Sequence, residues 1–288
     1  MPSLAEILRE ASQQLEAVTD TPRLDAELLL AHSLAIPRSK LLAQLHQEQI
    51  IPESFPDLIQ QRMNHAPIAY ITGTWEFFSM ELIVRPPLLV PRPETEHLVE
   101  EALNFLGKDG GEVLDLCTGT GCVALAIAKN APNTHVTATD LNPVAIEVAR
   151  QNAAKYKIDL TIHQGDLFNA LTPNTPKFRA ITANPPYVED AAWDTLDPVI
   201  TQHEDPKALL SGPDGLDCIR RIIDQTPVHL QSGGFLGIEM GHEQGQAVSD
   251  LLRQGGFTNI RIVQDLGGRD RIACATLRAC EEDLDIEI

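Results

Sequence analysis

The sequence predicts an α/β protein in which a mostly parallel sheet of seven strands is covered by helices and preceded by a small helical domain. From residue 112 onward, short runs rich in β-branched residues alternate with amphipathic helical segments. This alternation is typical of a parallel sheet with helices on both faces. The preceding N-terminal segment shows only the helical period. A chain of 288 residues is long enough for one large and one small domain.

Residues 1–68 are predicted to form a helical domain. Ser3 and Glu6 have the spacing of a capping box at the start of the first helix. Thr21 followed by Pro22 marks the start of the second helix. Two more short helices are expected near residues 39–46 and 54–65. Because no catalytic pattern occurs in this segment, we interpret it as a cap or substrate-recognition domain.

Residues 69–90 change period and are predicted to form a β-hairpin that links the helical domain to a larger domain, residues 91–288. The segment is rich in aromatic and β-branched residues around "FFSMEL", which is typical of paired strands. A helix is then expected within "PRPETEHLVEEALNFL", because its acidic first turn complements the helix dipole.

The larger domain contains the seven expected strands, and the last two are close enough in sequence for an antiparallel edge pair. Their ranges are 112–117, 135–140, 160–166, 179–184, 234–240, 258–264 and 271–277.

A net charge of −19 is the strongest global property of the chain. Proteins that bind bare DNA or an anionic membrane need a basic face, so neither a direct nucleic-acid partner nor a membrane partner is expected. A nucleic-acid partner reached through a local basic patch is an open alternative. The acidic C-terminal stretch "EEDLDIEI" is interpreted as a solvated end.

The cysteines favour a cytoplasmic protein without a disulfide framework or metal site. There are five, at positions 117, 122, 218, 274 and 280, and none has C-x-x-C spacing. The N-terminus is amphipathic and charged, unlike a signal peptide. No apolar run approaches the roughly 18 residues that a membrane span requires.

A glycine-rich loop follows the first strand, in "LDLCTGTGCVALA". Gly119 and Gly121 allow the backbone to approach a ligand, and the next helix directs its N–H groups toward it. Asp140 ends the second strand, where a carboxylate is placed to accept hydrogen bonds from the two hydroxyls of a ribose. With Ala124, the same glycines fit a dinucleotide fingerprint, so at this point an NAD enzyme is an open alternative.

The third strand ends in "HQGDLF". Asp166 is a candidate acceptor for the exocyclic amine of an adenine, and Phe168 for packing on the adenine face. A capping aspartate beside a core phenylalanine is an alternative for this pair alone. Both follow a strand at the carboxyl edge of the sheet, where open α/β sheets bind ligands.

The fourth strand is followed by Asn184-Pro185-Pro186-Tyr187. Two acceptors placed on the two hydrogens of a planar –NH2 group fix its orientation and favour a pyramidal nitrogen with a free lone pair. The Asn184 side-chain oxygen and the Pro185 carbonyl are candidates for these acceptors, and Tyr187 is a candidate for packing against the flat group. Hydride transfer needs no such arrangement, so the NAD alternative becomes weaker.

These motifs together resemble the amino-methyltransferases that use S-adenosylmethionine on amide or exocyclic nitrogens. The chain is further similar, from about residue 68 to 278, to the bacterial release factor glutamine methyltransferase (PrmC or HemK) family. The similar blocks are "YITGTWEFFSMELIVRPPLLVPRPETEHLVE", "VLDLCTGTGCVALAIA", "ALLSGPDGLD" and "DLGGRDRIACA". The "PRPETE" run favours this branch over the relative that modifies a glutamine of a ribosomal protein.

The resemblance implies a Rossmann-like class I S-adenosylmethionine-dependent methyltransferase sheet. It also implies methylation of the side-chain amide nitrogen (N5) of the glutamine in the Gly-Gly-Gln motif of class 1 peptide chain release factors, with S-adenosylhomocysteine as product. Asn184, Pro185, Pro186 and Tyr187 are implied to hold the glutamine and carry catalysis. The residues implied to contact the methyl donor are Cys117, Thr118, Gly119, Thr120, Gly121, Asp140, Phe168 and Asn184. Asp166 is added to this set because of its place after the third strand.

Two departures from the family pattern stand out. Cys117 occupies a position where many members carry glycine, and "HEDPKALL" differs from the usual spacing, which leaves the roles of Glu204 and Asp205 open. His203 with Glu204 is an alternative general base, although in-line transfer onto an oriented amide requires none.

Two rival functions are distinguishable. An adenine-N6 methyltransferase acting on DNA or RNA also uses this corner, but it requires base flipping and a basic groove. A non-catalytic S-adenosylmethionine-binding protein would not require Asn184.

Overall fold

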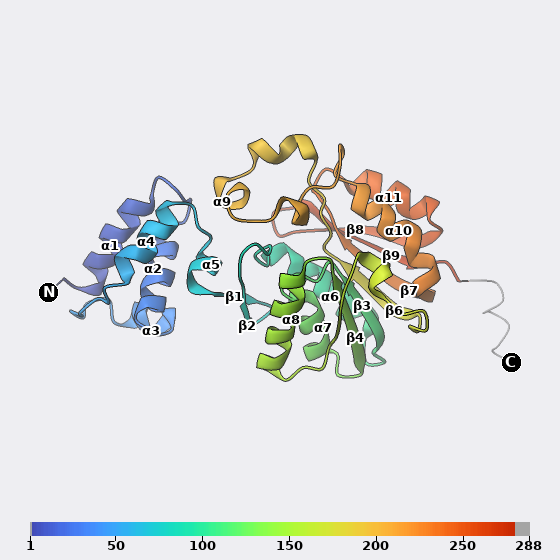
Figure 1. Cartoon of the computed structure of the whole chain (residues 1–288), viewed down its shortest axis with the longest axis horizontal. Helices are drawn as coiled ribbons and strands as arrows, with labels where there is room; N and C mark the ends of the chain where they lie inside the picture. The colour runs from blue at the N-terminus through green and yellow to red at the C-terminus, as the bar shows by residue number, and fades with distance from the viewer. Residues whose placement is uncertain (1, 280–288) are drawn as a thin grey trace. The chain divides into compact units, whose positions relative to one another are not determined.

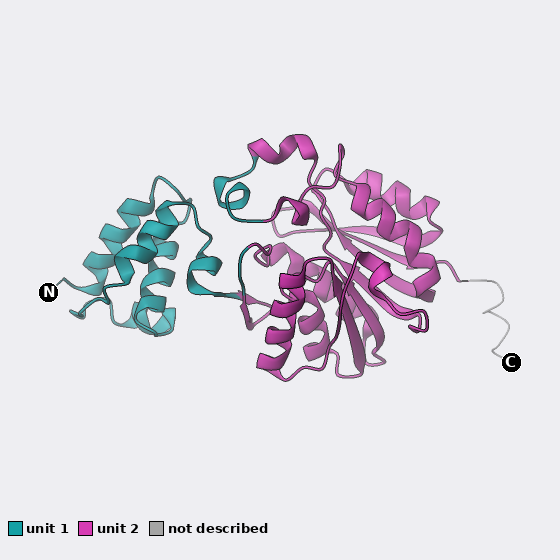
Figure 2. Cartoon of the chain, viewed as in Figure 1, with its two compact units in different colours: residues 1–75, 84–86, 196–204 teal, residues 76–83, 87–195, 205–288 magenta. Residues whose placement is uncertain are grey.

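The computed structural model describes residues 2–279, so Cys280 and the acidic C-terminal stretch lie outside the described residues. The chain forms two compact units (Figure 2). The smaller unit contains the chain up to Trp75 with the segments 84–86 and 196–204; the larger unit contains 76–83, 87–195 and the chain from Asp205 onward. We predicted domains at residues 1–68, 69–90 and 91–288. Their bounds and the role given to each of them stay predictions.

The smaller unit is a bundle of short helices. Its helices are α1 (Leu4–Leu15), α2 (Pro22–Ser33), α3 (Arg38–Ala43), α4 (Phe55–Met63), α5 (Ile68–Thr72) and α9 (Pro198–Thr201). The capping box of α1 is present, with the Glu6 N–H donating to the Ser3 hydroxyl and the Ser3 N–H donating to the Glu6 carboxylate. Helix α5 occupies residues for which we expected only a hairpin.

The core of this bundle follows from the helical period. One face of α1 and one face of α2 supply fully buried leucines, including Leu4, Leu8 and Leu29. A buried ion pair also crosses the bundle, since the Arg62 guanidinium lies 2.7 Å from the carboxylate of Asp25.

The larger unit contains a seven-stranded sheet, as predicted, in the order β5-β4-β3-β6-β7-β9-β8 (Figure 1). Only β9 runs antiparallel to its neighbours β7 and β8. The strands are β3 (Gly111–Leu116), β4 (Thr134–Asp140), β5 (Thr161–Gln164), β6 (Phe178–Ala183), β7 (Leu230–Glu239), β8 (Phe257–Gln264) and β9 (Asp270–Leu277).

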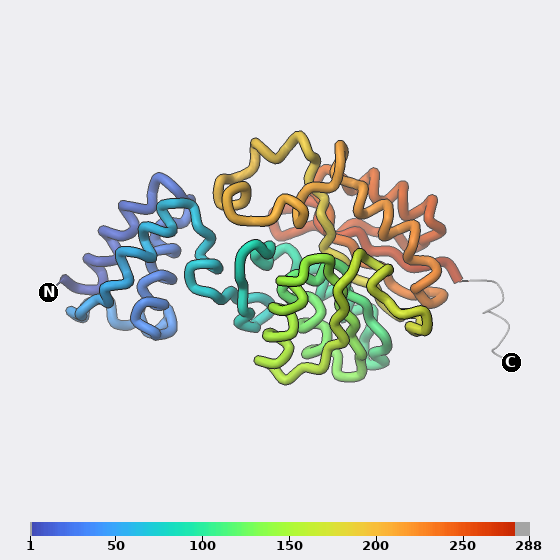
Figure 3. The backbone as a smooth tube through the Cα atoms, viewed as in Figure 1, coloured from blue at the N-terminus to red at the C-terminus, as the bar shows by residue number. Residues whose placement is uncertain are grey.

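Helices cover both faces of this sheet, and the chain alternates between strand and helix along the tube in Figure 3. They are α6 (Glu96–Leu106), α7 (Cys122–Asn130), α8 (Pro143–Tyr156), α10 (Asp217–His229) and α11 (Gly245–Gln254). Strand β3 is buried on both sides: Val113 packs in a cluster with α6 and α7, whereas Leu114 packs in a cluster with α10 and α11. This double burial explains why two apolar residues, Val113 and Leu114, occur consecutively in β3 and do not alternate with polar ones.

The strand order reverses between β3 and β6, at the centre of the sheet. Their last register pair is Leu116 with Ala183, so both strands end together at the carboxyl edge. Open α/β sheets bind ligands in the crevice beyond this reversal. The fold therefore directs attention to the residues that follow β3 and β6.

The hairpin strands β1 (Thr74–Phe77) and β2 (Met80–Ile83) form a separate two-stranded sheet. In the larger unit, the Ile83 N–H donates to the Asn152 side chain of α8, which donates back to the Ile83 carbonyl. No helix within residues 2–279 has the length and apolar character that crossing a bilayer demands.

Candidate active site

A cavity of about 730 Å³ lies at the carboxyl edge of the sheet in the larger unit. Its size is within the usual range for small-molecule sites. Most of the residues that we predicted to contact a ligand line this cavity: Cys117, Thr118, Gly119, Thr120, Asp140, Asp166, Asn184 and Pro186. The structure thus brings together side chains from four separate strand ends.

Four predicted residues do not line the cavity: Gly121, Phe168, Pro185 and Tyr187. For Phe168 the reason is clear, because its ring is buried in the core and stacks on His229 with a centroid distance of 4.6 Å. The neighbouring Leu167 lines the cavity instead. Leu167 thus supplies apolar surface to the cavity, and the contact of Phe168 with an adenine stays a prediction.

The glycine-rich loop uses left-handed backbone at three positions: Cys117 (φ 57°), Gly119 (φ 55°) and Gly121 (φ 81°). A Cβ on Gly121 would lie 3.1 Å from the Cβ of Ala149 in α8, so this glycine serves close packing between α7 and α8. Glycine adopts left-handed backbone without the steric penalty that Cβ imposes, so Cys117 carries a steric cost that a glycine at this position would not.

A buried asparagine fastens this loop to the rest of the unit. The Asn152 side chain donates to the carbonyl of Thr120 as well as to that of Ile83, at 3.0 Å each. We did not single it out from the sequence, because an asparagine inside a helix gives no signal of its distant partners.

Asp140 is held by two backbone donors at the end of β4. The Gly119 N–H donates to one carboxylate oxygen and the Asn142 N–H donates to the other, both at 2.8 Å. Burial nevertheless raises the pKa of Asp140 above its ordinary value. The carboxylate lines the cavity with its position fixed.

Asp115, near the end of β3, is a buried cavity residue that we did not select from the sequence. The hydroxyls of Thr118 and Thr182 donate to its two oxygens at 2.6 and 2.8 Å. Burial, the largest influence, raises the pKa of Asp115 to about 6. The sequence signal for this residue was a single charge inside the otherwise apolar run "VLDL".

Asp166 forms an ion pair with Arg221 of α10, with 2.6 Å between the guanidinium and a carboxylate oxygen. Both residues line the cavity. Arg221 was not predicted, and its approach occupies one of the two oxygens that we expected to meet an adenine amine.

The corner after β6 is organised by side chains from distant parts of the unit. The Asn184 amide nitrogen donates to the Thr95 hydroxyl at 3.2 Å, and that hydroxyl donates to Glu239 at 2.6 Å. The Tyr187 hydroxyl donates to the other oxygen of Glu239 at 3.2 Å. Within residues 2–279, no group donates to the Asn184 side-chain oxygen or to the Pro185 carbonyl. The corner thus keeps two acceptors without intramolecular donors.

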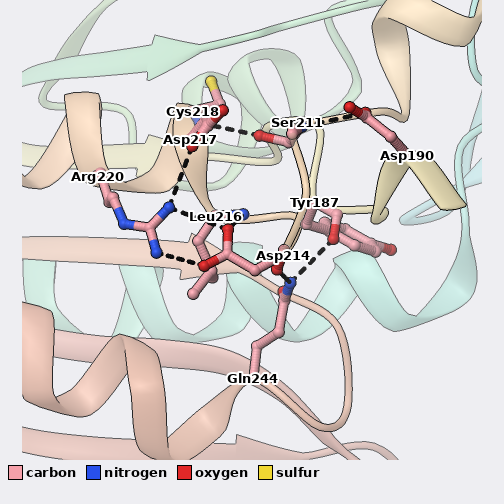
Figure 4. A network of polar contacts seen from close by, with 10 residues as sticks. Tyr187, Asp190, Ser211, Asp214, Leu216, Asp217, Cys218, Arg220 and Gln244 are labelled. Atoms are coloured by element: carbon pink, nitrogen blue, oxygen red, sulfur yellow. Dashed lines mark hydrogen bonds and ion pairs between the residues drawn. The ribbon is translucent and has the colours of Figure 1, made fainter.

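The backbone after this corner is fixed by the loop 209–215. Val188 forms an isolated parallel bridge with Leu210. The Gln244 side chain donates to the carbonyl of Tyr187 at 3.0 Å, within the polar network of Figure 4. A Cβ on Gly215 would lie only 2.3 Å from that carbonyl oxygen. Only glycine permits this close approach.

The remaining candidates differ in their surroundings. His203 and Glu204 belong to the smaller unit, where the imidazole nitrogen Nε2 lies 3.3 Å from the carbonyl of Asn64 and Glu204 is buried. Asp205 belongs to the larger unit and lines the cavity, and its carboxylate accepts a hydrogen bond from the Lys207 N–H.

The cavity fits a ligand that combines an apolar ring with polar groups. The Thr139 hydroxyl lines the cavity and is completely buried, yet it has no hydrogen-bond partner among the described residues. Buried polar groups are normally paired, so this hydroxyl indicates that a bound molecule supplies the partner. The fixed carboxylate of Asp140 and the apolar side chains of Leu141 and Leu167 lie in the same lining.

The sheet order and a site at its central strand ends define a class I methyltransferase fold. Solved structures agree: a methyltransferase from Pyrococcus furiosus matches with a TM-score of 0.53 at 17% identity, over 71% of this chain and 91% of that one. A Thermus thermophilus 16S rRNA N2 G1207 methyltransferase, in complex with AdoMet and guanosine, matches with a TM-score of 0.53 at 16% identity. The match covers 71% of this chain and 50% of that one. At these identities the likeness concerns the fold.

Sequence comparison is more specific. Residues 95–204 match the methyltransferase small domain, and residues 6–73 match the PrmC N-terminal domain. A release factor glutamine methyltransferase from Vibrio cholerae is 42% identical over 92% of this chain and 93% of its own length. The release factor glutamine methyltransferase from Coxiella burnetii is 39% identical over 96% of this chain and 99% of its own length. The one from Rhodopirellula baltica is 38% identical over 88% of this chain and 89% of its own length. The chain belongs to the release factor glutamine methyltransferase family.

Proposed function

We propose that this enzyme transfers a methyl group from S-adenosylmethionine to the side-chain amide nitrogen of the glutamine in the Gly-Gly-Gln motif of class 1 peptide chain release factors. The observation that carries the proposal is the pair of acceptors at the corner after β6, the Asn184 side-chain oxygen and the Pro185 carbonyl. Neither has a donor within residues 2–279. Family membership supports the same substrate.

The methyl donor would be held by the loop 117–121 together with Asp140, Asp166 and Leu167. Asp140 is placed to accept hydrogen bonds from ribose hydroxyls, and Leu167 with Leu141 offers apolar surface to the adenine. When bound, S-adenosylmethionine supplies an electrophilic methyl group on a sulfonium. The unpartnered hydroxyl of Thr139 supports this assignment.

The glutamine amide would be oriented by the two acceptors of the corner. Each accepts one hydrogen of the –NH2 group, so the nitrogen lone pair is directed out of the amide plane. The ring of Tyr187 would restrain the flat group. Rate acceleration then comes from holding the nitrogen in line with the reacting carbon in a water-poor site.

Proton removal needs no dedicated base in this scheme. The nitrogen carries its extra proton only after it has received the methyl group, and water can accept that proton. A contribution of His203 or Glu204 as base is the alternative, and a pH–rate profile of the variant His203→Ala would reveal it.

The helical unit is proposed to recognise the release factor. The match of residues 6–73 to the PrmC N-terminal domain supports a role particular to this family. The cytoplasm, where release factors act, is the proposed location. A direct nucleic-acid substrate is disfavoured by the net charge of −19.

A transfer assay with S-adenosylmethionine labelled in its methyl group tests the proposal. We expect label in a purified class 1 release factor, no label when its Gly-Gly-Gln glutamine is replaced by alanine, and none in DNA or RNA. Label in nucleic acid alone would favour the adenine-N6 alternative, and label in ribosomal protein alone would favour the related glutamine methyltransferase.

A further inference from the structure

Thr95 and Glu239 support the catalytic corner, and neither is part of the acceptor pair. Thr95 lines the cavity, whereas Glu239 does not. Thr95 is the last residue of the 3-10 turn η1 (Pro93–Thr95), and Glu239 is the last residue of β7. Their exposed fractions are 1% and 2%. Both are therefore shielded from water, and their hydrogen bonds must be made within the protein.

The side chains of Asn184, Thr95 and Glu239 form a chain of hydrogen bonds that runs in one direction, from Asn184 to Glu239. A threonine hydroxyl has a single proton, and a carboxylate can only accept. The 2.6 Å contact with Glu239 therefore uses the Thr95 proton. Toward Asn184, 3.2 Å away, the same hydroxyl can only accept.

This direction determines which end of the Asn184 amide faces Thr95. The –NH2 end donates to the hydroxyl, whereas the carbonyl end would have met an oxygen with no proton to give. The side-chain oxygen is consequently left for another partner. A flipped amide would instead present –NH2 to the –NH2 group of the substrate, so two donors would oppose each other.

Glu239 also restrains the side chain of Tyr187, at the other end of the corner. Its other oxygen accepts the hydrogen bond of the Tyr187 hydroxyl. Charged groups that act on Glu239 include Arg271, which favours the carboxylate, and Glu94, which opposes it. Burial raises the pKa of Glu239, and the hydrogen bonds from Thr95 and Tyr187 counter that effect. One buried carboxylate thus holds both side chains of the corner.

We infer that Thr95 and Glu239 are positioning residues, which fix the orientation of the Asn184 amide so that its oxygen faces the amide nitrogen to be methylated. This inference rests on the proposed function.

The matched pair Thr95→Ser and Thr95→Val tests it. Serine keeps the hydroxyl, whereas valine has nearly the same shape without it. For Thr95→Val we expect kcat for release-factor methylation to fall about 10- to 100-fold, the range that loss of one well-placed hydrogen bond implies. The affinity for S-adenosylmethionine should stay close to that of Thr95→Ser. The Tm of Thr95→Val should be lower, because a buried oxygen of Glu239 loses its donor.

Coupling to Glu239 gives a second measurement. Because Glu239 acts on Asn184 through Thr95, Glu239→Gln should lower kcat by a smaller factor in the Thr95→Val background than in the wild type. A third readout needs no turnover. The side-chain –NH2 resonances of Asn184, assigned by their absence in Asn184→Asp, should shift in Thr95→Val and remain near their wild-type positions in Thr95→Ser.

The outcomes separate this inference from the proposed function. If the wild type methylates no release factor, the proposed function fails. If the wild type is active and Thr95→Val has the kcat of Thr95→Ser, the positioning role is wrong. A loss of cofactor affinity as large as the loss in kcat would also overturn it, since it indicates a merely structural role. Should Thr95→Val not fold, Thr95→Ala replaces it in the same comparison.

Discussion

Cys117 and Asn184 directly follow a register pair of neighbouring parallel strands, since Leu116 of β3 lies opposite Ala183 of β6. The first begins the glycine-rich loop, and the second begins the acceptor corner. The reversal of strand order between β3 and β6 leaves a crevice there. Two segments 67 positions apart in the sequence thereby serve one cavity.

Alanine substitutions at Gly121 and Gly119 are expected to differ in their main effect. Gly121→Ala should mainly lower stability, and Gly119→Ala should mainly weaken cofactor binding. Gly121→Ala places a Cβ 3.1 Å from the Cβ of Ala149, whereas a Cβ on Gly119 has no atom within 4 Å. Since both have positive φ, each substitution costs about 1 kcal/mol in backbone strain, and Gly121→Ala costs more because α8 must shift.

Of these two glycines, only Gly119 lines the cavity. Gly119→Ala should therefore have the larger effect on the dissociation constant for S-adenosylmethionine. Urea denaturation and calorimetric titration of both variants measure the two quantities. The opposite ranking in either experiment would contradict the assignment.

Replacement of Cys117 by alanine is expected to lower the stability of the protein more than replacement by glycine. Both variants remove the thiol, but only glycine adopts φ 57° without strain. Cys117→Gly should therefore be more stable than Cys117→Ala by about 1 kcal/mol. Denaturant midpoints of the two variants, measured side by side, give the difference. An alanine variant as stable as the glycine variant would mean that this backbone is not strained.

Asp140 is expected to dominate the polar contribution to cofactor binding. Its carboxylate is held in place by two backbone donors, and a charged acceptor strengthens hydrogen bonds from hydroxyls. Asp140→Asn should weaken binding of S-adenosylmethionine by about 10- to 100-fold. Asp159→Asn, at an exposed position outside the cavity, is the control with the same change of charge. Equal affinities of the two variants would rule out this role for Asp140.

Asp115 gives the stability a defined pH dependence. Its pKa is about 6 in the native state, raised chiefly by burial from its ordinary value of 3.8. Between these values the native state binds more protons than the unfolded state, so this contribution to stability falls as pH rises. The full difference corresponds to at most about 3 kcal/mol.

The variant Asp115→Asn lacks this titration. The Tm of the wild type relative to that of Asp115→Asn should therefore decrease from pH 4 to pH 6.5 and then level off. Thermal unfolding of both proteins at several pH values measures this difference. A constant difference across that range would show that Asp115 does not titrate there.

Much of the fold follows from local pattern. The capping box of Ser3 and Glu6 and the alternation of strands and helices depend on residues close in sequence, and both were predicted correctly. The short helix α5 was missed because "IAYIT" is rich in residues that also suit strands.

The support of the site does not follow from local pattern. Thr95 contacts Asn184 across 89 positions of sequence and Glu239 across 144. Neither contact has a spacing that a periodic pattern could reveal. The exchange of Phe168 for Leu167 in the cavity wall has a similar cause, because both residues lie in the 3-10 turn η2 (Leu167–Ala170), where no regular period assigns a face.

The most direct test of the central claim is fragmentation mass spectrometry of a class 1 release factor incubated with S-adenosylmethionine and either the wild type or Asn184→Ala. We predict one added methyl group on the side chain of the Gly-Gly-Gln glutamine with the wild type, and a rate at least about 100-fold lower with the variant. Methylation of that glutamine by Asn184→Ala at the wild-type rate, or of a different residue by the wild type, would contradict the account.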